Sequence, residues 1–393
     1  MTDFQREVIS VIRSSLSGEK AKVSDSFDLN RLYSFSESQQ IQTLIFSSIG
    51  EDIRLKDDSI YTKFFTSVCR AINISEQQQH ELGILFNTFE KSGIDYLPIK
   101  GIVMKKLYPA PEYRSMSDAD ILVRKEQSSV VDKIMSEAGY THTETDDNVT
   151  VWEKGCVVVE LHVSFVPTDS DLYDYYGGGE WDIAVRDSGT HFSLKNEDFF
   201  IATLLHFVKH LRESGAGIRN ICDFYILFKA YPELDRNYLI EKLKSFDLDV
   251  FYGHLIDVVN CWFADGEETD AVTELTDIMF RSGTYGIKSV GDSTVNAQYM
   301  QRYSHAKLVK LYHMAFFSKD RMRREFPILC KAPYLMPFCR IAHWCDVILH
   351  RRETLKDAKR SFDDMSLDAM NKRADELDRI GLKLYFSKNN DKV

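Results

Sequence analysis

The sharpest local signal in the sequence is a short stretch in the first third of the chain, Ser117-Asp118-Ala119-Asp120-Ile121-Leu122-Val123. The stretch reads as a strand, and on a strand side chains two residues apart point to the same face. Asp118 and Asp120 therefore present two carboxylates side by side, while Ala119 and Ile121 point into the core. Two such charges repel unless a cation lies between them, and oxygen ligands on a rigid strand suit Mg²⁺ (or Mn²⁺). A solvated strand end is the alternative interpretation of an isolated Asp-x-Asp motif.

A third carboxylate lies in a second, nearly all-apolar strand at residues 156–165. Glu160 and His162 interrupt this strand and again share one face. An acid inside such a strand is costly unless it is paired with a base or bound to metal. Three carboxylates from two strands can hold two cations for the in-line displacement of a phosphoryl or nucleotidyl group. A salt bridge to a neighbouring lysine or arginine is the alternative for Glu160.

Candidate phosphate ligands lie upstream, where Lys100-Gly101 follows a short buried strand and precedes a helix. The glycine permits close approach of a ligand to the backbone, the start of a helix favours an anion, and Lys100 supplies a point charge. Arg114, just before the acidic strand, is placed to reach the same phosphates. These positions predict a triphosphate-binding turn beside the metal site.

Hydrophobic periodicity divides the chain into three parts. Helical spacing dominates up to residue 92, including a helix predicted to start at Ser75, and it returns from about residue 196, with a helical group at 299–317 and an irregular proline-containing linker at 326–337. Between them the period alternates. We expect an N-terminal helical region (1–92), an α/β unit (93–196) and a C-terminal helical region (197–393), with the strands and helices of the unit at residues 95–100, 102–108, 118–123, 130–139, 149–152 and 156–165.

Composition excludes several classes of protein. The 393 residues carry 49 basic and 60 acidic side chains, a net charge of −11, which disfavours coating of nucleic acid or attachment to an anionic membrane. The seven cysteines are scattered and form no CxxC pair, and no long apolar segment is present. We expect a cytoplasmic protein with free thiols and no membrane contact, for which nucleic acid is an unfavoured partner.

These motifs together resemble a known family. Lys100-Gly101, Leu107-Tyr108-Pro109, Arg114 and residues 118–123 are similar to the bacterial uncharacterised nucleotidyltransferases, a branch of the polymerase β-like nucleotidyltransferase superfamily. Glu160-Leu161-His162 resembles the strand that bears the family's third acid. The resemblance implies an α+β fold, in which a polymerase β-like palm (a small mixed sheet with helices) is flanked by helical regions. In one departure, the wider superfamily has Gly-Ser where this chain has Lys100-Gly101.

The resemblance also implies an activity, the Mg²⁺-dependent (or Mn²⁺-dependent) transfer of a nucleoside monophosphate from an NTP such as ATP. The catalytic and metal-binding residues would be Asp118, Asp120 and Glu160, and the nucleotide-binding residues would be Lys100, Gly101, Arg114, Ser117 and His162. The acceptor stays open among a small molecule, a saccharide, a protein hydroxyl and an RNA end. The alternatives are a metal-dependent glycosyltransferase that uses a sugar nucleotide, and a non-catalytic protein that binds a nucleotide or a partner.

Two pairs of side chains in the later helical region have simpler interpretations. His206 and His210 are four residues apart on one helix face, which favours packing or nucleotide contact over a zinc site, because no metalloprotease motif surrounds them. Arg219 and Asp223 are also four apart, and an intrahelical ion pair explains them.

Overall fold

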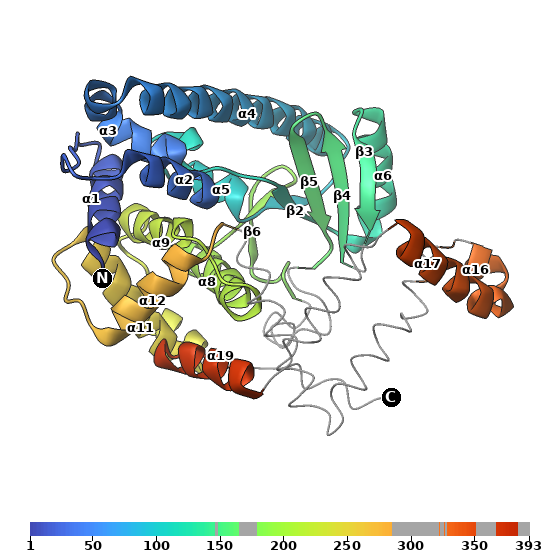
Figure 1. Ribbon diagram of the computed structural model, residues 1–393. Coiled ribbons are helices and arrows are strands. Elements are labelled where there is room, and N and C mark those ends of the chain that lie inside the picture. Colours follow the sequence, from blue (N-terminus) through green and yellow to red (C-terminus); the bar gives the residue numbers. More distant parts are fainter. Residues whose placement is uncertain are drawn as a thin grey trace.

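The computed structural model describes residues 1–145, 148–164, 179–284, 322, 326, 328–350 and 367–383. Most of them form a mixed sheet beside a body of helices, while residues 322, 326 and 328–350 contribute a separate small hydrophobic cluster (Figure 1). The seven strands found in these residues are ordered β3-β4-β5-β2-β1-β7-β6. β2 pairs in parallel with β5, and β1 in parallel with β7, while the other neighbours are antiparallel. The strand bounds are β1 Tyr96–Pro98, β2 Ala119–Val123, β3 Thr141–Thr145, β4 Val149–Lys154, β5 Val157–His162, β6 Ala184–Ser188 and β7 His191–Leu194.

One face of this sheet is sealed by two helices, α4 (Asp58–Lys91) and α6 (Ser128–Glu137). Ala119, Ile121 and Val123 of β2 pack into the core between the sheet and these helices, as do the odd-numbered residues of β5. The prediction that Ala119 and Ile121 point into the core is therefore confirmed. Because side chains alternate along a strand, the even-numbered residues of β2 and β5 face the opposite side of the sheet.

The body of helices has a core of its own, built from both ends of the chain. The N-terminal helices α1 (Asp3–Ser17), α2 (Leu29–Gln39) and α3 (Gln42–Lys56) share this core with α8 (Asn196–Glu213), α9 (Arg219–Ala230), α10 (Arg236–Lys244), α11 (Asp249–Phe263), α12 (Asp270–Arg281) and α19 (Leu367–Arg379). Trp262 and Phe64 are among its fully buried side chains. The two segments predicted as separate helical regions thus pack together, and the division of the chain at residues 92 and 196 stays a prediction.

The 34-residue helix α4 joins the two cores. Its first turns place Ile60 and Phe64 in the helical body, and its last turns place Leu85 and Phe89 against the sheet (Figure 1). The predicted helix start at Ser75 is wrong, because Ser75 lies buried in the middle of α4. The true N-cap is Asp57, whose carboxylate accepts hydrogen bonds from the backbone of residues 59 and 60.

The sequence predictions for the α/β unit are otherwise confirmed for β1, β2, β4, β5 and α6, and the helix predicted at 102–108 is the shorter α5 (Gly101–Lys105). Strands β3, β6 and β7 were not predicted. The linker predicted at 326–337 is largely helical, with α16 (Ile328–Lys331), a 3₁₀ turn at Pro333–Leu335 and the start of α17 (Met336–His350). Proline at the first or second position of a helical turn lacks only an N–H group that has no partner there. The helical group predicted at 299–317 lies outside the described residues.

The chain is therefore a mixed α+β protein, as expected. No helix in the described part of the chain is long and apolar enough to cross a membrane.

Candidate active site

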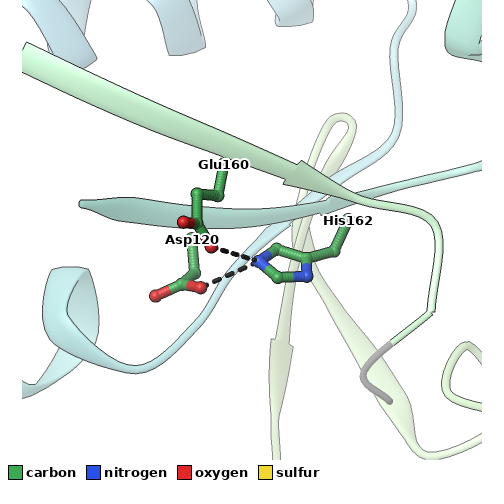
Figure 2. A group of neighbouring side chains, drawn as sticks. All are labelled: Asp120, Glu160 and His162. Carbon is green, nitrogen blue, oxygen red and sulfur yellow. Dashed lines mark hydrogen bonds and ion pairs between the residues drawn. The ribbon is translucent and has the colours of Figure 1, made fainter. Parts of the chain in front are cut away.

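Two acids from neighbouring parallel strands meet on the face of the sheet opposite α4 and α6. Asp120 of β2 is in register with Glu160 of β5, and Leu122 is in register with His162. Residues in register on parallel neighbours project to the same side, so Asp120, Glu160 and His162 converge. Their oxygen and nitrogen ligand atoms lie within 4.8 Å of one another (Figure 2). This convergence is the arrangement that the sequence pattern predicted for two of the three acids.

Asp120 lies at the centre of this group and is only 3% exposed. Its Oδ1 accepts two hydrogen bonds, from Nζ of Lys100 at 2.6 Å and from Nε2 of His162 at 2.8 Å. The same Nε2 lies 3.4 Å from Oε2 of Glu160, so the imidazole bridges the two acids (Figure 2). The Glu160 side chain is 28% exposed and lies at the open edge of the group.

The surroundings shift the pKa values of these groups in different directions. Burial alone would raise the pKa of Asp120, but the charge of Lys100 and the hydrogen bond from His162 overcome it and lower that pKa. Burial favours neutral His162, yet hydrogen bonds to Asp120 and Glu160 outweigh it and raise the pKa of the imidazole. Asp120 is thus held ionised, which is the protonation state that a metal ligand requires.

Asp118 lies immediately before β2 and is partly exposed, and it stands outside the group of three converging side chains. Burial, and then the charges of Asp120 and Glu160, raise the pKa of Asp118. Its carboxyl group therefore lies within the same electrostatic field as the two other acids, where a cation would relieve the repulsion. Ser117 is exposed at the edge of this turn.

The turn between β1 and α5 carries Lys100 and Gly101 next to the acids. The backbone N–H of Ile99 donates to the carbonyl of Asp120 at 3.0 Å, which ties the turn to β2. A Cβ atom at Gly101 would lie 2.9 Å from Cγ of Met116 and 3.2 Å from Nη1 of Arg114. Glycine is thus required here because protein atoms occupy the space of a side chain, a packing reason that the motif alone does not reveal.

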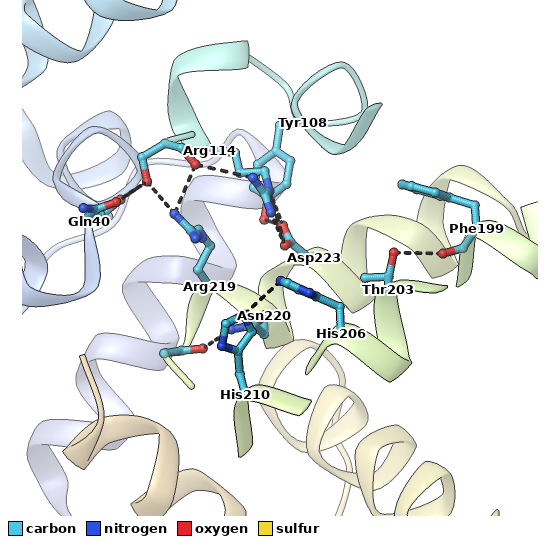
Figure 3. Close-up of polar contacts among 12 residues, drawn as sticks. Gln40, Tyr108, Arg114, Phe199, Thr203, His206, His210, Arg219, Asn220 and Asp223 are labelled. Atoms are coloured by element: carbon cyan, nitrogen blue, oxygen red, sulfur yellow. Dashed lines mark hydrogen bonds and ion pairs between the residues drawn. The ribbon is translucent and has the colours of Figure 1, made fainter. Parts of the chain in front are cut away.

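Arg114 is buried behind this turn and bound to Asp223, a residue that the sequence analysis paired with Arg219 instead. Its Nε and Nη2 each donate to Asp223 of α9 at 2.9 Å, and the hydroxyl of Tyr108 donates to the same carboxylate at 2.7 Å (Figure 3). The predicted pair between Arg219 and Asp223 is wrong, because Arg219 donates instead to the backbone carbonyl and hydroxyl of Ser115. Asp223 and Arg114 lie 109 positions apart, so helical spacing gave no signal of their pairing.

Helix α8 contributes a histidine pair near the site. Nε2 of His206 lies 2.9 Å from Nε2 of His210, so one ring donates and the other accepts (Figure 3). Burial, and then the charge of Lys209, lowers the pKa of His210 to about 4, and burial with the charge of Lys100 lowers that of His206. Among the described residues, the one group of three or more potential metal ligands is Asp120, Glu160 and His162. The two histidines are therefore uncharged at neutral pH, and they do not belong to a second cluster of this kind.

Comparison with known proteins identifies one family to which this geometry can be related. A profile described as uncharacterised nucleotidyltransferase matches residues 25–264, more than half of the chain. The chain belongs to this family, and membership supports a transferase activity of the nucleotidyl-transfer kind. The matched range spans β1, β2 and β5 together with helices α2 to α11. Searches of curated proteins and of solved structures give no match.

Proposed function

We propose that this protein is a Mg²⁺-dependent (or Mn²⁺-dependent) nucleotidyltransferase that moves a nucleoside monophosphate from an NTP to an acceptor hydroxyl or phosphate. The observation that carries the proposal is the in-register pair of acids, Asp120 and Glu160, on neighbouring parallel strands. In this proposal the sheet is a polymerase β-like palm, set between the helical regions within residues 93–196.

The residues present fit a divalent ion. Two carboxylates and an imidazole nitrogen converge within 4.8 Å, and the charges of Asp120 and Glu160 reach a third carboxylate, Asp118, which lies outside this group. Hard oxygen ligands of this kind suit Mg²⁺ and Mn²⁺. We assign Asp118, Asp120 and Glu160 as the metal-holding residues. A bound divalent ion would neutralise the charge that develops on the transferred phosphoryl group.

The remaining roles belong to the protein's own side chains. We assign Lys100 as a positive charge toward the phosphates, and Gly101 and Ser117 as further nucleotide-binding residues. Arg114 contributes its charge from behind Gly101, because Asp223 holds it there. His162 fixes Asp120 and Glu160 in the orientation that they share (Figure 2). Glu160, the more exposed of the two acids, is placed to receive the proton of an acceptor hydroxyl.

The position of Glu160 also distinguishes the proposed function from the glycosyltransferase and the non-catalytic alternatives. A glycosyltransferase that binds metal through Asp-x-Asp has no need of a third acid, whereas here Glu160 is paired in register with Asp120 on the adjoining strand. Intact acids at Asp118, Asp120 and Glu160 likewise favour catalysis over a purely binding role.

The first experiment measures the thermal stability of the purified protein with ATP, GTP, CTP, UTP and UDP-sugars, each with and without Mg²⁺ or Mn²⁺. We expect metal-dependent stabilisation by an NTP, of about 2.7 kcal/mol at a ligand concentration 100-fold above Kd. The Asp118→Asn/Asp120→Asn variant should lose this response, and Asp257→Asn, at an exposed position of α11, should retain it. A response to UDP-sugars alone would support the glycosyltransferase instead.

A second measurement tests catalysis itself. With the NTP that stabilises the protein, release of pyrophosphate and transfer of an α-phosphate label to a candidate acceptor should both require metal and the three acids. Transfer that persists in a variant lacking all three acids would contradict the proposed site, and nucleotide binding without transfer to any acceptor would favour the non-catalytic alternative.

A further inference from the structure

Lys100 is also a direct hydrogen-bond partner of Asp120. Its Nζ lies 2.6 Å from Oδ1 of Asp120, and Nε2 of His162 lies 2.8 Å from the same oxygen. A carboxylate oxygen offers about two lone-pair positions to hydrogen-bond donors, so both positions of Oδ1 are filled. A divalent ion that binds through this oxygen must displace one of the two donors.

Of the two donors, Lys100 is the one that can leave. The His162 side chain is 8% exposed and its ring lies between Asp120 and Glu160 on the strand β5. The Lys100 side chain is 28% exposed and ends in a compact, strongly hydrated ammonium group on a flexible stem. Its ammonium can therefore exchange the carboxylate for water at lower cost than the buried imidazole can.

The backbone at Lys100 is a second and independent observation. Its φ is 49° and its ψ is −118°, a conformation that glycine adopts at lower cost than lysine does. The next residue is itself a glycine, so the turn does not lack small residues. A strained lysine at this point indicates that its side chain has a use.

We propose that Lys100 is a built-in cation of the carboxylate site, which neutralises Asp120 until a divalent ion displaces its ammonium group toward the nucleotide's polyphosphate. The inference rests on the proposed function and deepens it, because it couples metal and nucleotide binding. The metal releases the lysine that the nucleotide uses, so each ligand favours the other, and this coupling is reciprocal.

The first test follows the lysine itself. The protein is treated briefly with an amine-acylating reagent, with and without Mg²⁺ and in the absence of nucleotide, and modification of each lysine is measured by mass spectrometry. We expect labelling of Lys100 to rise several-fold with Mg²⁺ and to fall again when ATP is added. Lys106, exposed at the end of α5, should not change and serves as the internal control. Labelling of Lys100 that is indifferent to bound Mg²⁺ overturns the inference.

The second test measures metal affinity directly, by titrating Mn²⁺ alone and detecting free ion by electron paramagnetic resonance. Lys100→Met should bind Mn²⁺ more tightly than the wild type by on the order of tenfold, because a competing charge a few ångströms away has been removed. Lys106→Met should leave the affinity unchanged, and Asp120→Asn should abolish it. Thermal unfolding of each variant verifies that it is folded.

The outcomes separate this inference from the proposed function. Mn²⁺ binding that depends on Asp120 but is unaltered or weakened in Lys100→Met overturns the role of Lys100 and leaves the nucleotidyltransferase site standing. Absence of Mn²⁺ binding in the wild type, with ATP present as well, overturns both.

Discussion

Two buried aspartates, Asp120 in the sheet and Asp223 in the helical body, are held by cations in contrasting ways. Asp120 meets the single nitrogen of Lys100, whose side chain is 28% exposed. Asp223 meets two nitrogens of Arg114, whose side chain is 12% exposed, and the hydroxyl of Tyr108 (Figure 3). One pair joins a carboxylate to a mobile point charge, and the other joins it to a rigid planar fork.

The difference indicates which aspartate can exchange its cation partner and which keeps it. A bidentate arginine inside the protein gives geometric specificity, and removal of either partner leaves an uncompensated charge. A partly exposed lysine can be replaced by another cation. We therefore interpret the Asp120 pair as the working site and the Asp223 pair as the fastening that positions it.

The largest effect is expected from removing the acids of the working site. Asp120→Asn and Glu160→Gln should each lower nucleotidyl transfer by about a thousandfold or more, because charge on the phosphoryl group would no longer be neutralised. The assay is initial-rate measurement of pyrophosphate release at saturating Mg²⁺. Asp257→Asn is the matched control on α11 and should retain the full rate. If Asp120→Asn also keeps its rate, Asp120 is a structural acid like Asp223.

The next largest effect concerns stability and is expected from breaking the pair of Arg114 and Asp223. Asp223→Asn should destabilise the protein by about 3–5 kcal/mol, because the Arg114 guanidinium would be left buried and uncompensated. Urea-induced unfolding measures this loss, and Asp257→Asn should change the free energy of unfolding by no more than about 0.5 kcal/mol.

A double variant shows whether that loss comes from the stranded charge. Arg114→Met/Asp223→Leu replaces the pair with apolar side chains and should recover most of the stability. A double variant as unstable as Asp223→Asn would mean that the contacts of this carboxylate, including that from Tyr108, matter more than its charge balance.

The convergence of Asp120 and Glu160 was predictable from the sequence because its signal is local. Asp120 and Glu160 each interrupt an apolar strand, and alternation assigns each acid to the face opposite the buried residues. The lengths of the strands and the order of the motifs along the chain indicated that the two acids lie close together. What periodicity did not show is that His162 bridges these acids and that Asp118 stands apart from the three converging side chains.

The fastening was not predictable, because its contacts join residues far apart in the chain. Asp223 lies four residues from a more obvious partner, Arg219, and only the packing of α9 against the turn before β2 brings it to Arg114. The missed strands have a different physical cause. Every residue of β3 is exposed and β6 is nearly so, which suits their places at the two edges of the sheet but leaves no apolar alternation to detect.

A smaller effect is expected from pH, through the histidine pair on α8. The pKa of His210 is lowered from 6.5 to about 4, so between these values the unfolded chain binds a proton that the folded protein does not. Folding stability should therefore fall as the pH drops from about 6.5 to 4, by about 1.4 kcal/mol per pH unit at most for this group. Unfolding of the wild type and of His210→Gln across this range isolates the contribution, since the variant should show the shallower slope. Identical slopes would show that His210 titrates in its ordinary range.

The smallest effects are expected from exchanging the two cation types, and they test the comparison most directly. Arg114→Lys keeps the charge but leaves one nitrogen in place of the two that donate to Asp223, and it should cost about 1–2 kcal/mol of stability. Lys100→Arg places a planar guanidinium at a partly exposed position and should change the free energy of unfolding by no more than about 0.5 kcal/mol.

The same exchange at Lys100 should weaken Mn²⁺ binding several-fold, because two parallel hydrogen bonds hold a guanidinium on a carboxylate more firmly than one. Urea midpoints and Mn²⁺ titrations of both variants provide the data. If Arg114→Lys and Lys100→Arg cost the same stability and neither alters metal affinity, the two aspartates are held alike. If they differ as expected, the choice of lysine at one carboxylate and arginine at the other separates a replaceable counter-ion from a permanent one.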